Sequence, residues 1–224
     1  MHTTYGTRVA VLVGDYLFAQ SSWLLANLDN LEVIKLISKV IADFANGEIS
    51  QAGALFDTSV TTAAYLDKSY YKTASLIAAA CRSEAVFSGC NEALKADMFE
   101  YGRRLGLAFQ VVDDVLDFTA TSEQLGKPQG QDLASGNLTA PAIFALAHPI
   151  HGPRLRELID AEFQVGGGLE EALRLVNAAG GIEAARALAR SEGDAARAEL
   201  ARLPHGAPRA SLDAMVDFVL QRMS

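Results

Sequence analysis

Apolar residues recur along the chain at intervals of three and four positions, which is the period of an amphipathic α-helix. No segment alternates apolar and polar residues in the way that a half-buried β-strand does. Breaks rich in Gly, Asn, Asp and Ser divide this pattern into long helices followed by shorter ones. The helices are expected at residues 6–28, 31–56, 63–88, 92–118, 139–147, 154–163, 169–178, 182–203 and 211–223. The sequence therefore predicts an all-α fold in a single domain that covers residues 1–224.

Length, composition and charge narrow the classes of protein that fit this pattern. A chain of 224 residues, half of them apolar, can bury a full hydrophobic core. The net charge of -8 and the lack of a basic stripe argue against nucleic acid as a partner. No apolar run is expected to reach the length of a transmembrane segment, and residues 1–6 lack the order of a signal peptide. These features predict a soluble globular chain.

The two cysteines, Cys81 and Cys90, are nine residues apart. On a continuous helix this spacing places their side chains on opposite faces, so we expect no disulfide bond between them. A pair of free thiols fits a reducing compartment better than an oxidising one.

Three carboxylates, those of Asp113, Asp114 and Asp117, interrupt the apolar pattern of the helix predicted at residues 92–118. Burying them without a compensating cation costs too much free energy, so a positive charge is expected to meet them. Asp113 and Asp117 are one helical turn apart on one face, and Asp114 lies beside Asp117. Carboxylates without a nearby His or Cys favour Mg²⁺, which keeps several waters and is completed by phosphate oxygens of a substrate. The pattern therefore predicts a magnesium site at these aspartates.

Other polar residues are weaker candidates when each is considered singly. Gln110 places an amide one turn before the aspartates, and Lys72 with Thr73 forms a polar pair in the preceding helix. Lys127 lies in the longest irregular segment, residues 119–138, whose glycines and polar residues suit a lid that closes over an anion.

Glycine positions predict where helices approach one another. Gly102 and Gly106 are spaced by four, so on one helix face they permit the close approach of another helix. Gly47, beside Glu48 and Gln51, marks either a close helix contact or a solvated turn. The solvated turn is the simpler interpretation.

The run from residue 106 to residue 118, GLAFQVVDDVLDF, resembles the second aspartate-rich motif of the all-trans polyprenyl diphosphate synthases. Segments at residues 5–20, 47–51, 72–74 and 126–133 resemble the same family and follow the family's order. The resemblance covers nearly all of the chain. Among the subfamilies, the chain is most similar to the solanesyl (nonaprenyl) and related long-chain synthases of plants, algae and cyanobacteria.

This resemblance implies an isoprenoid-synthase-type bundle of helices around a central cavity, normally assembled as a homodimer. It implies a trans-prenyltransferase, in which an allylic diphosphate ionises with the help of Mg²⁺ and isopentenyl diphosphate attacks the carbocation. The released pyrophosphate takes the proton. The product is expected to be a long-chain polyprenyl diphosphate for isoprenoid biosynthesis, such as a quinone side chain.

The resemblance also assigns roles to residues of this sequence. Metal ions are expected at Asp113, Asp114 and Asp117, and Lys72 is expected to stabilise the leaving diphosphate as a catalytic residue. The residues expected to bind the diphosphate are Lys72, Thr73, Gln110 and Lys127.

One departure from the family pattern concerns the N-terminus. Family members carry a first aspartate-rich motif on an earlier helix, and upstream of it basic and histidine residues that hold isopentenyl diphosphate. Met1 falls just after this region, so the chain is expected to lack the N-terminal helices and to be inactive in isolation. The faces that those helices cover are then expected to expose roughly several hundred Å² of apolar surface.

Three interpretations remain open at this point. The chain is a polyprenyl diphosphate synthase polypeptide, a non-catalytic subunit that binds and modulates a complete synthase, or a plain helical domain whose aspartates bind a structural cation. The first two imply a homodimer or a heteromer with a complete synthase. The subfamily resemblance alone implies a plastid location.

Overall fold

The described residues, 2–120, 128–164 and 166–223, form helices joined by short connections in a computed structural model, and no β-strand occurs among them. The prediction of an all-α fold is confirmed. The helices are α1 (His2–Tyr5), α2 (Thr7–Ala26), α3 (Leu31–Ala52), α4 (Thr62–Ser69), the π-helix η1 (Tyr70–Ala74), α5 (Ser75–Phe87), α6 (Glu92–Thr119), α8 (Gln131–Ala134), α9 (Ala140–Leu146), α10 (His151–Asp160), α11 (Gly168–Ala178), α12 (Gly181–Glu199), the 3-10 turn η2 (Leu200–Arg202) and α13 (Ala207–Gln221).

Helix starts follow the polar breaks that the sequence shows. The side chains of Asn30, Thr61 and Asn91 each accept a hydrogen bond from the backbone N–H three residues later. These N-caps satisfy donors that the first turn of a helix leaves without an intrahelical acceptor. The first turns of α3, α4 and α6 are therefore fixed by single polar residues at the breaks.

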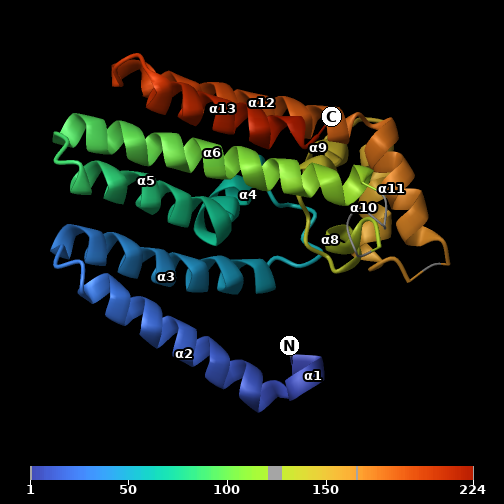
Figure 1. The fold of residues 1–224 in the computed structure, drawn as a ribbon. Helices are drawn as coiled ribbons and strands as arrows, with labels where there is room; N and C mark the ends of the chain where they lie inside the picture. The colour runs from blue at the N-terminus through green and yellow to red at the C-terminus, as the bar shows by residue number, and fades with distance from the viewer. Residues whose placement is uncertain (1, 121–127, 165, 224) are drawn as a thin grey trace.

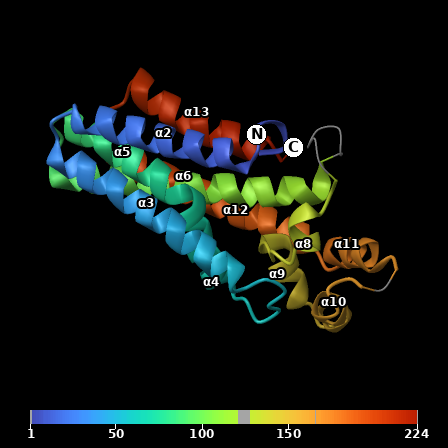
Figure 2. The same ribbon diagram turned by 90° about the horizontal axis from the view of Figure 1, so that it is seen from below.

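Helix α6 runs through the middle of the molecule, with α5 on one side and α12 and α13 on the other (Figure 1). Its inward face is apolar and fully buried at Val111, Val112 and Val115, which belong to the main hydrophobic core. Helices α10 and α11 lie together at the end of the bundle where α6 ends (Figures 1 and 2). The aspartate segment therefore lies on the helix that contacts most of the bundle.

Two glycines of α6 lie directly against the backbone of the preceding helix. A Cβ atom at Gly102 would lie 2.6 Å from the carbonyl oxygen of Ile77, and one at Gly106 would lie 2.6 Å from the Cα of Ala74. No side chain fits at these distances. The prediction that this glycine pair permits close approach of another helix is confirmed.

A third glycine, Gly47 of α3, is buried against the π-helix η1. A Cβ atom there would lie 3.2 Å from the Cβ of Tyr71 and 3.3 Å from the backbone nitrogen of Lys72. The interpretation of this position as a solvated turn was wrong, because α3 packs closely on η1. The nearby side chain of Gln51 consequently faces Lys72.

The segment expected to form one helix at residues 63–88 is interrupted by the π-helix η1. A π-helix inserts one extra residue into a turn and changes the direction of the side chains that follow, and such segments are frequent at functional sites. Lys72 and Thr73 both lie in η1. Cys81 lies farther along in α5, and it and Cys90 are free thiols, as the spacing predicted.

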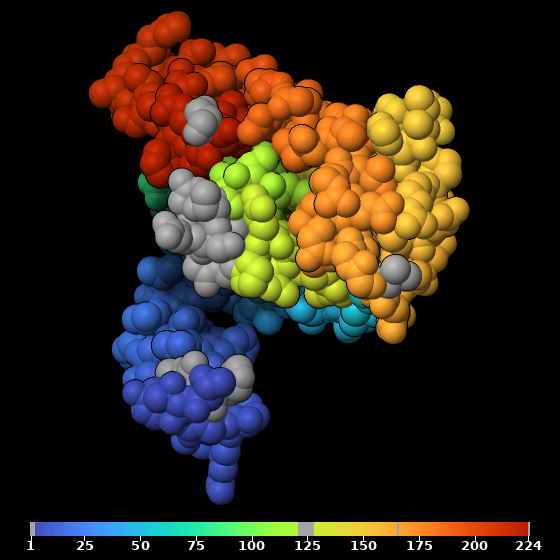
Figure 3. Space-filling model, turned by 90° about the vertical axis from the view of Figure 1, so that its right-hand side faces the viewer, coloured from blue at the N-terminus to red at the C-terminus, as the bar shows by residue number. Residues whose placement is uncertain are grey.

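Helix α2 exposes a large apolar surface. None of its residues is buried, and Figure 3 shows the N-terminal segment, in blue, projecting from the body of the molecule. Its exposed apolar side chains are Val9, Val11, Leu12, Tyr16, Leu17, Phe18, Trp23 and Leu24. The expectation of an exposed apolar surface is confirmed on this helix.

Helix α2 is also long and apolar enough to cross a membrane by length and composition. The expectation that no apolar run reaches this length was therefore wrong. Core helices of soluble proteins meet the same measures, so the match alone assigns no membrane to this helix.

Replacing Gly106 by alanine tests the close contact between α6 and η1. The added methyl group must displace the Ala74 backbone, so we expect Gly106→Ala to lower the free energy of unfolding by about 1–3 kcal/mol. Thermal denaturation would show this as a lower Tm, by roughly 2–4 °C for each kcal/mol. The matched control is Gly14→Ala in α2, where a Cβ meets no atom within 4 Å and no loss is expected. An unchanged Tm for Gly106→Ala would contradict the packing.

Candidate active site

Three of the residues predicted to act together, Thr73, Gln110 and Asp114, are joined by hydrogen bonds. The hydroxyl of Thr73 donates to Oε1 of Gln110 at 2.6 Å, and Nε2 of Gln110 donates to Oδ1 of Asp114 at 2.8 Å. Gln110 and Asp114 are one turn apart on α6, so they lie on the same face. Thr73 reaches them from η1 because Gly106 brings η1 against α6.

A fourth residue, Tyr65 of α4, completes this network. Its hydroxyl donates to the second carboxylate oxygen of Asp114, Oδ2, at 2.6 Å. Both residues are almost fully buried. Each oxygen of Asp114 thus accepts a short hydrogen bond from a residue fixed by the helix packing.

Burial dominates the electrostatics of Asp114. It raises the pKa of this carboxyl from its ordinary value to about 7, while the hydrogen bonds from Tyr65 and Gln110 act in the opposite direction. Burial and the neighbouring Asp114 charge also raise the pKa of Tyr65 well above its ordinary value, so this hydroxyl stays a donor. The ionised form of Asp114 therefore depends on positive groups or donors nearby.

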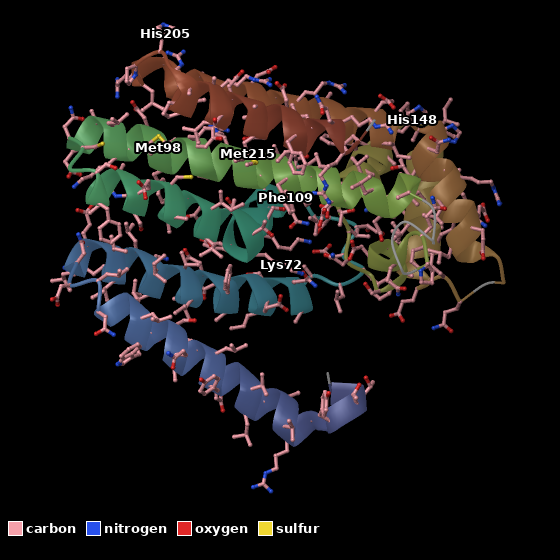
Figure 4. The ribbon with its side chains drawn as sticks, viewed as in Figure 1. Lys72, Met98, Phe109, His148, His205 and Met215 are labelled. Atoms are coloured by element: carbon pink, nitrogen blue, oxygen red, sulfur yellow. The ribbon has the colours of Figure 1, made fainter. Side chains whose placement is uncertain are left out.

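A small pocket of about 50 Å³ lies beside this network. It is lined by residues from α3, α4, η1, α6 and the segment around α8, namely Gln51, Tyr65, Lys68, Ser69, Lys72, Gln110, Asp114, Asp132, Asn137 and Thr139. Lys72 is exposed and lies on the side of η1 that faces α3 (Figure 4). Its ammonium donates to Oε1 of Gln51 at 2.9 Å and lies 3.8 Å from Oε1 of Glu48. The pocket therefore combines two lysines with two carboxylates.

The three aspartates of the predicted metal site have different surroundings. Asp113 is exposed, and its Oδ1 accepts a hydrogen bond from Nη2 of Arg222 at 2.8 Å. The Arg222 guanidinium also lies 4.8 Å from the ring centroid of Phe109. Asp117 is buried, and its Oδ2 accepts from the backbone N–H of Asp132 at 3.2 Å. Only Asp114 of the three lines the pocket.

The carboxylates of the described residues do not form a ready-made metal site. Within residues 2–120, 128–164 and 166–223, no group of three or more His, Cys, Asp or Glu side chains lies close enough together to hold an ion. Asp113 still presents hard oxygen donors at the surface, which suits a Mg²⁺ ion that keeps waters and takes its remaining ligands from phosphate. Mg²⁺ therefore stays a prediction, with Asp113 as the accessible ligand.

The remaining predicted site residue, Lys127, lies outside the described residues, and so do residues 121–126 of the predicted lid. The pocket instead includes residues that the sequence patterns did not single out, chiefly Tyr65, Lys68 and Asn137. One signal was available for Lys68, which lies four residues before Lys72 and thus one helical turn away. Tyr65 carried no signal beyond that of an ordinary core aromatic residue.

Comparisons with known proteins show the family and the fold of this chain. Residues 1–176 match the polyprenyl synthetase family. Solanesyl-diphosphate synthase 2, chloroplastic, of Oryza sativa subsp. japonica is 58% identical over 223 residues, which is 100% of this chain and 55% of that protein. The chain thus spans about half the length of such a curated relative.

Solved structures share the fold. A decaprenyl diphosphate synthase from Rhodobacter capsulatus is 36% identical with a TM-score of 0.90, and the match covers 100% of this chain and 69% of that one. A polyprenyl synthase from Caulobacter crescentus CB15, complexed with calcium and isoprenyl diphosphate, is 32% identical with a TM-score of 0.91 and the same coverage.

Stability measured against pH tests the burial of Asp114. In the unfolded chain an aspartate titrates near pH 4, so between about pH 4 and pH 7 the folded state binds the extra proton. Stability must therefore fall as the pH rises through this window and level off above it. Between pH 5.5 and 7.5 we expect wild type to lose about 2 kcal/mol relative to Asp114→Asn, which has no charge to bury.

Urea denaturation of both proteins in a chelating buffer measures this difference. Titration of all other groups is common to the two proteins and cancels in the comparison. Parallel curves of unfolding free energy against pH would show that Asp114 is not desolvated.

Proposed function

This chain belongs to the polyprenyl synthetase family, and on that premise we propose that it is a trans-prenyltransferase polypeptide of long-chain polyprenyl diphosphate synthesis. Its substrates would be an allylic diphosphate and isopentenyl diphosphate. The relatives support the class of product, since they include a solanesyl-diphosphate synthase and a decaprenyl diphosphate synthase. The chloroplastic relatives support a plastid location.

The observation that carries this proposal is the hydrogen-bonded set Thr73–Gln110–Asp114 beside the exposed ammonium of Lys72. A diphosphate that leaves an allylic carbon gathers negative charge on its oxygens. Lys72 is free to meet that charge, because its contacts to Gln51 and Glu48 are exposed and weak. Asp114 holds the Gln110 amide in one orientation, and Gln110 in turn holds the Thr73 hydroxyl beside Lys72.

In the proposed reaction the allylic C–O bond breaks and its electron pair leaves with pyrophosphate. The double bond of isopentenyl diphosphate then forms the new C–C bond, and pyrophosphate accepts the proton that is lost. Mg²⁺, when bound, would neutralise charge on the diphosphate oxygens, with Asp113 as the protein ligand that is accessible. The Caulobacter crescentus synthase, complexed with calcium and isoprenyl diphosphate, supports a divalent cation on this fold.

A second candidate function is that of a non-catalytic subunit that binds and modulates a complete synthase. The exposed apolar surface of α2 favours an assembled state, since a monomer rarely leaves such a surface in water. A homodimer and a heteromer with a complete synthase would both cover it. Activity distinguishes the two functions.

Ligand-induced stabilisation tests the diphosphate site. Mg²⁺ together with geranylgeranyl diphosphate should raise the Tm more than either alone, because a ligand that binds only the folded state stabilises it. At a hundred times Kd the gain is about 3 kcal/mol, or roughly 6–12 °C. Asp113→Asn should lose most of this shift. Asp194→Asn, on α12 outside the pocket, is the control and should keep it.

Equal shifts in wild type and Asp113→Asn would remove Asp113 from the site. An equal rise in Tm with the diphosphate in the presence and absence of Mg²⁺ would contradict the proposed role of the metal.

Incorporation of labelled isopentenyl diphosphate tests the catalytic role. We expect no detectable product from the 224-residue chain alone, because its sequence holds one aspartate-rich motif, at residues 113–117, whereas the family resemblance implies two. Losing a site that orients a substrate forfeits on the order of 7 kcal/mol of barrier reduction. A fusion that adds the N-terminal part of the rice relative ahead of Met1 should be active. Product from the chain alone would contradict the first expectation, and an inactive fusion would favour the non-catalytic subunit.

A further inference from the structure

Lys68 of α4 is a second cation in the pocket, and its environment differs from that of Lys72. Its side chain is partly buried, and its ammonium donates to Oδ1 of Asn137 at 2.7 Å and to the carbonyl oxygen of Leu138 at 3.4 Å. The ammonium also lies 5.9 Å from the ring centroid of Tyr65. Among the residues that the structure describes, no carboxylate lies within ion-pair distance of Lys68. Its hydrogen-bond acceptors are neutral, so no ion pair within the described part of the chain offsets the positive charge of Lys68. That charge therefore acts on the other charged groups of the pocket.

The partners of Lys68 belong to a turn that reaches the end of α6. The backbone N–H of Asn137 donates to the carbonyl oxygen of Asp132 at 2.9 Å, and its side-chain amide donates to Oδ1 of Asp132 at 3.4 Å. The N–H of Asp132 then donates to the carboxylate of Asp117 at 3.2 Å. Lys68 therefore connects the helix before Lys72 to the segment that packs on the aspartates.

Charge balance in the pocket depends on this lysine. Asp114 and Asp132 place two carboxylates in the pocket, and Lys68 and Lys72 place two ammonium groups there. Asp114 and Asp132 both interact favourably with the charge of Lys68. Without Lys68, the carboxylates would outnumber the remaining cation, and a diphosphate that approaches Lys72 would meet net repulsion.

We propose that Lys68 is a positioning residue of the diphosphate site. Its charge offsets Asp114 and Asp132, and its hydrogen bonds hold the Asn137–Leu138 turn beside Lys72, while Lys72 itself contacts the diphosphate. This role rests on the proposed function, because it concerns the same diphosphate. In this proposal Lys68 is held by hydrogen bonds within the fold, and Lys72 is the lysine that contacts the substrate.

Calorimetric titration of the 224-residue chain with inorganic pyrophosphate and Mg²⁺ tests this role. Lys68→Met should weaken binding by roughly tenfold to a hundredfold. Lys68→Gln should weaken it nearly as much, because it loses the charge and keeps only a donor for Asn137. Lys68→Arg should keep most of the affinity, and Asn137→Ala, which leaves the charge in place, should lose less than Lys68→Met. Lys35→Met, an exposed lysine of α3 outside the pocket, is the matched control and should bind as wild type.

The outcomes separate this inference from the proposed function. If wild type binds, Lys72→Met does not, and Lys68→Met binds as wild type, then Lys68 has no positioning role and the proposed function stands. If Lys68→Arg binds pyrophosphate as weakly as Lys68→Met, the role is also overturned, because the positive charge at this position would not determine the affinity. Should Lys68→Met fail to fold, Lys68→Gln and Lys68→Arg carry the same comparison. Absence of pyrophosphate binding by wild type overturns the proposed function and this role together.

Discussion

The contact between α6 and the helix formed by α4, η1 and α5 determines the geometry of the site. Gly102 and Gly106 leave no side chain between the two backbones, so the chain at Ala74 and Ile77 lies directly against α6. At this separation Thr73 reaches Gln110, and Tyr65 reaches Asp114. Hydrogen bonds of 2.6 Å tolerate little displacement, so a larger residue at either glycine would break the network as well as the packing. The same contact holds the Lys72 backbone between α6 and α3. Gly47 of α3 has no side chain, which allows α3 to approach η1 closely.

The packing also buries the carboxylate of Asp114, where a negative charge is costly in free energy. Burial raises the pKa of Asp114 to about 7, so the charged form is retained only to the extent that its neighbours stabilise it. Tyr65, Gln110 and Lys68 all favour that form, and they come from α4 and α6. These groups are in place before any ligand arrives. An active site gains from such preorganisation, because no dipole has to reorient when charge develops on a leaving group.

The site residues fall into two sets with different freedom. Asp114, Asp117 and Lys68 take part in hydrogen bonds within the fold, and a ligand could displace those bonds only by disturbing the helix packing. Asp113 and Lys72 are exposed, and their partners Arg222 and Gln51 are side chains at the surface or only partly buried, which a ligand can replace. The exposed pair is therefore suited to contact a metal ion or a diphosphate, and the internal set is suited to hold that pair in position.

The sequence by itself determined the helices and most of the participants in the site. Helical periodicity depends only on residue spacing, so the all-α fold, the close contact at Gly102 and Gly106, and the grouping of Thr73, Gln110 and Asp114 could be predicted from local patterns and family resemblance. Tertiary structure alone decided that Asp114 and Asp117 are buried and Asp113 is not, that Gly47 is a packing position, and that η1 is a π-helix. It also brought Lys68 to Asn137, a residue 69 positions away in the chain. The reason is physical: burial and the extra residue of a π-turn are set by the helices that pack against a segment, and these lie far from it in sequence.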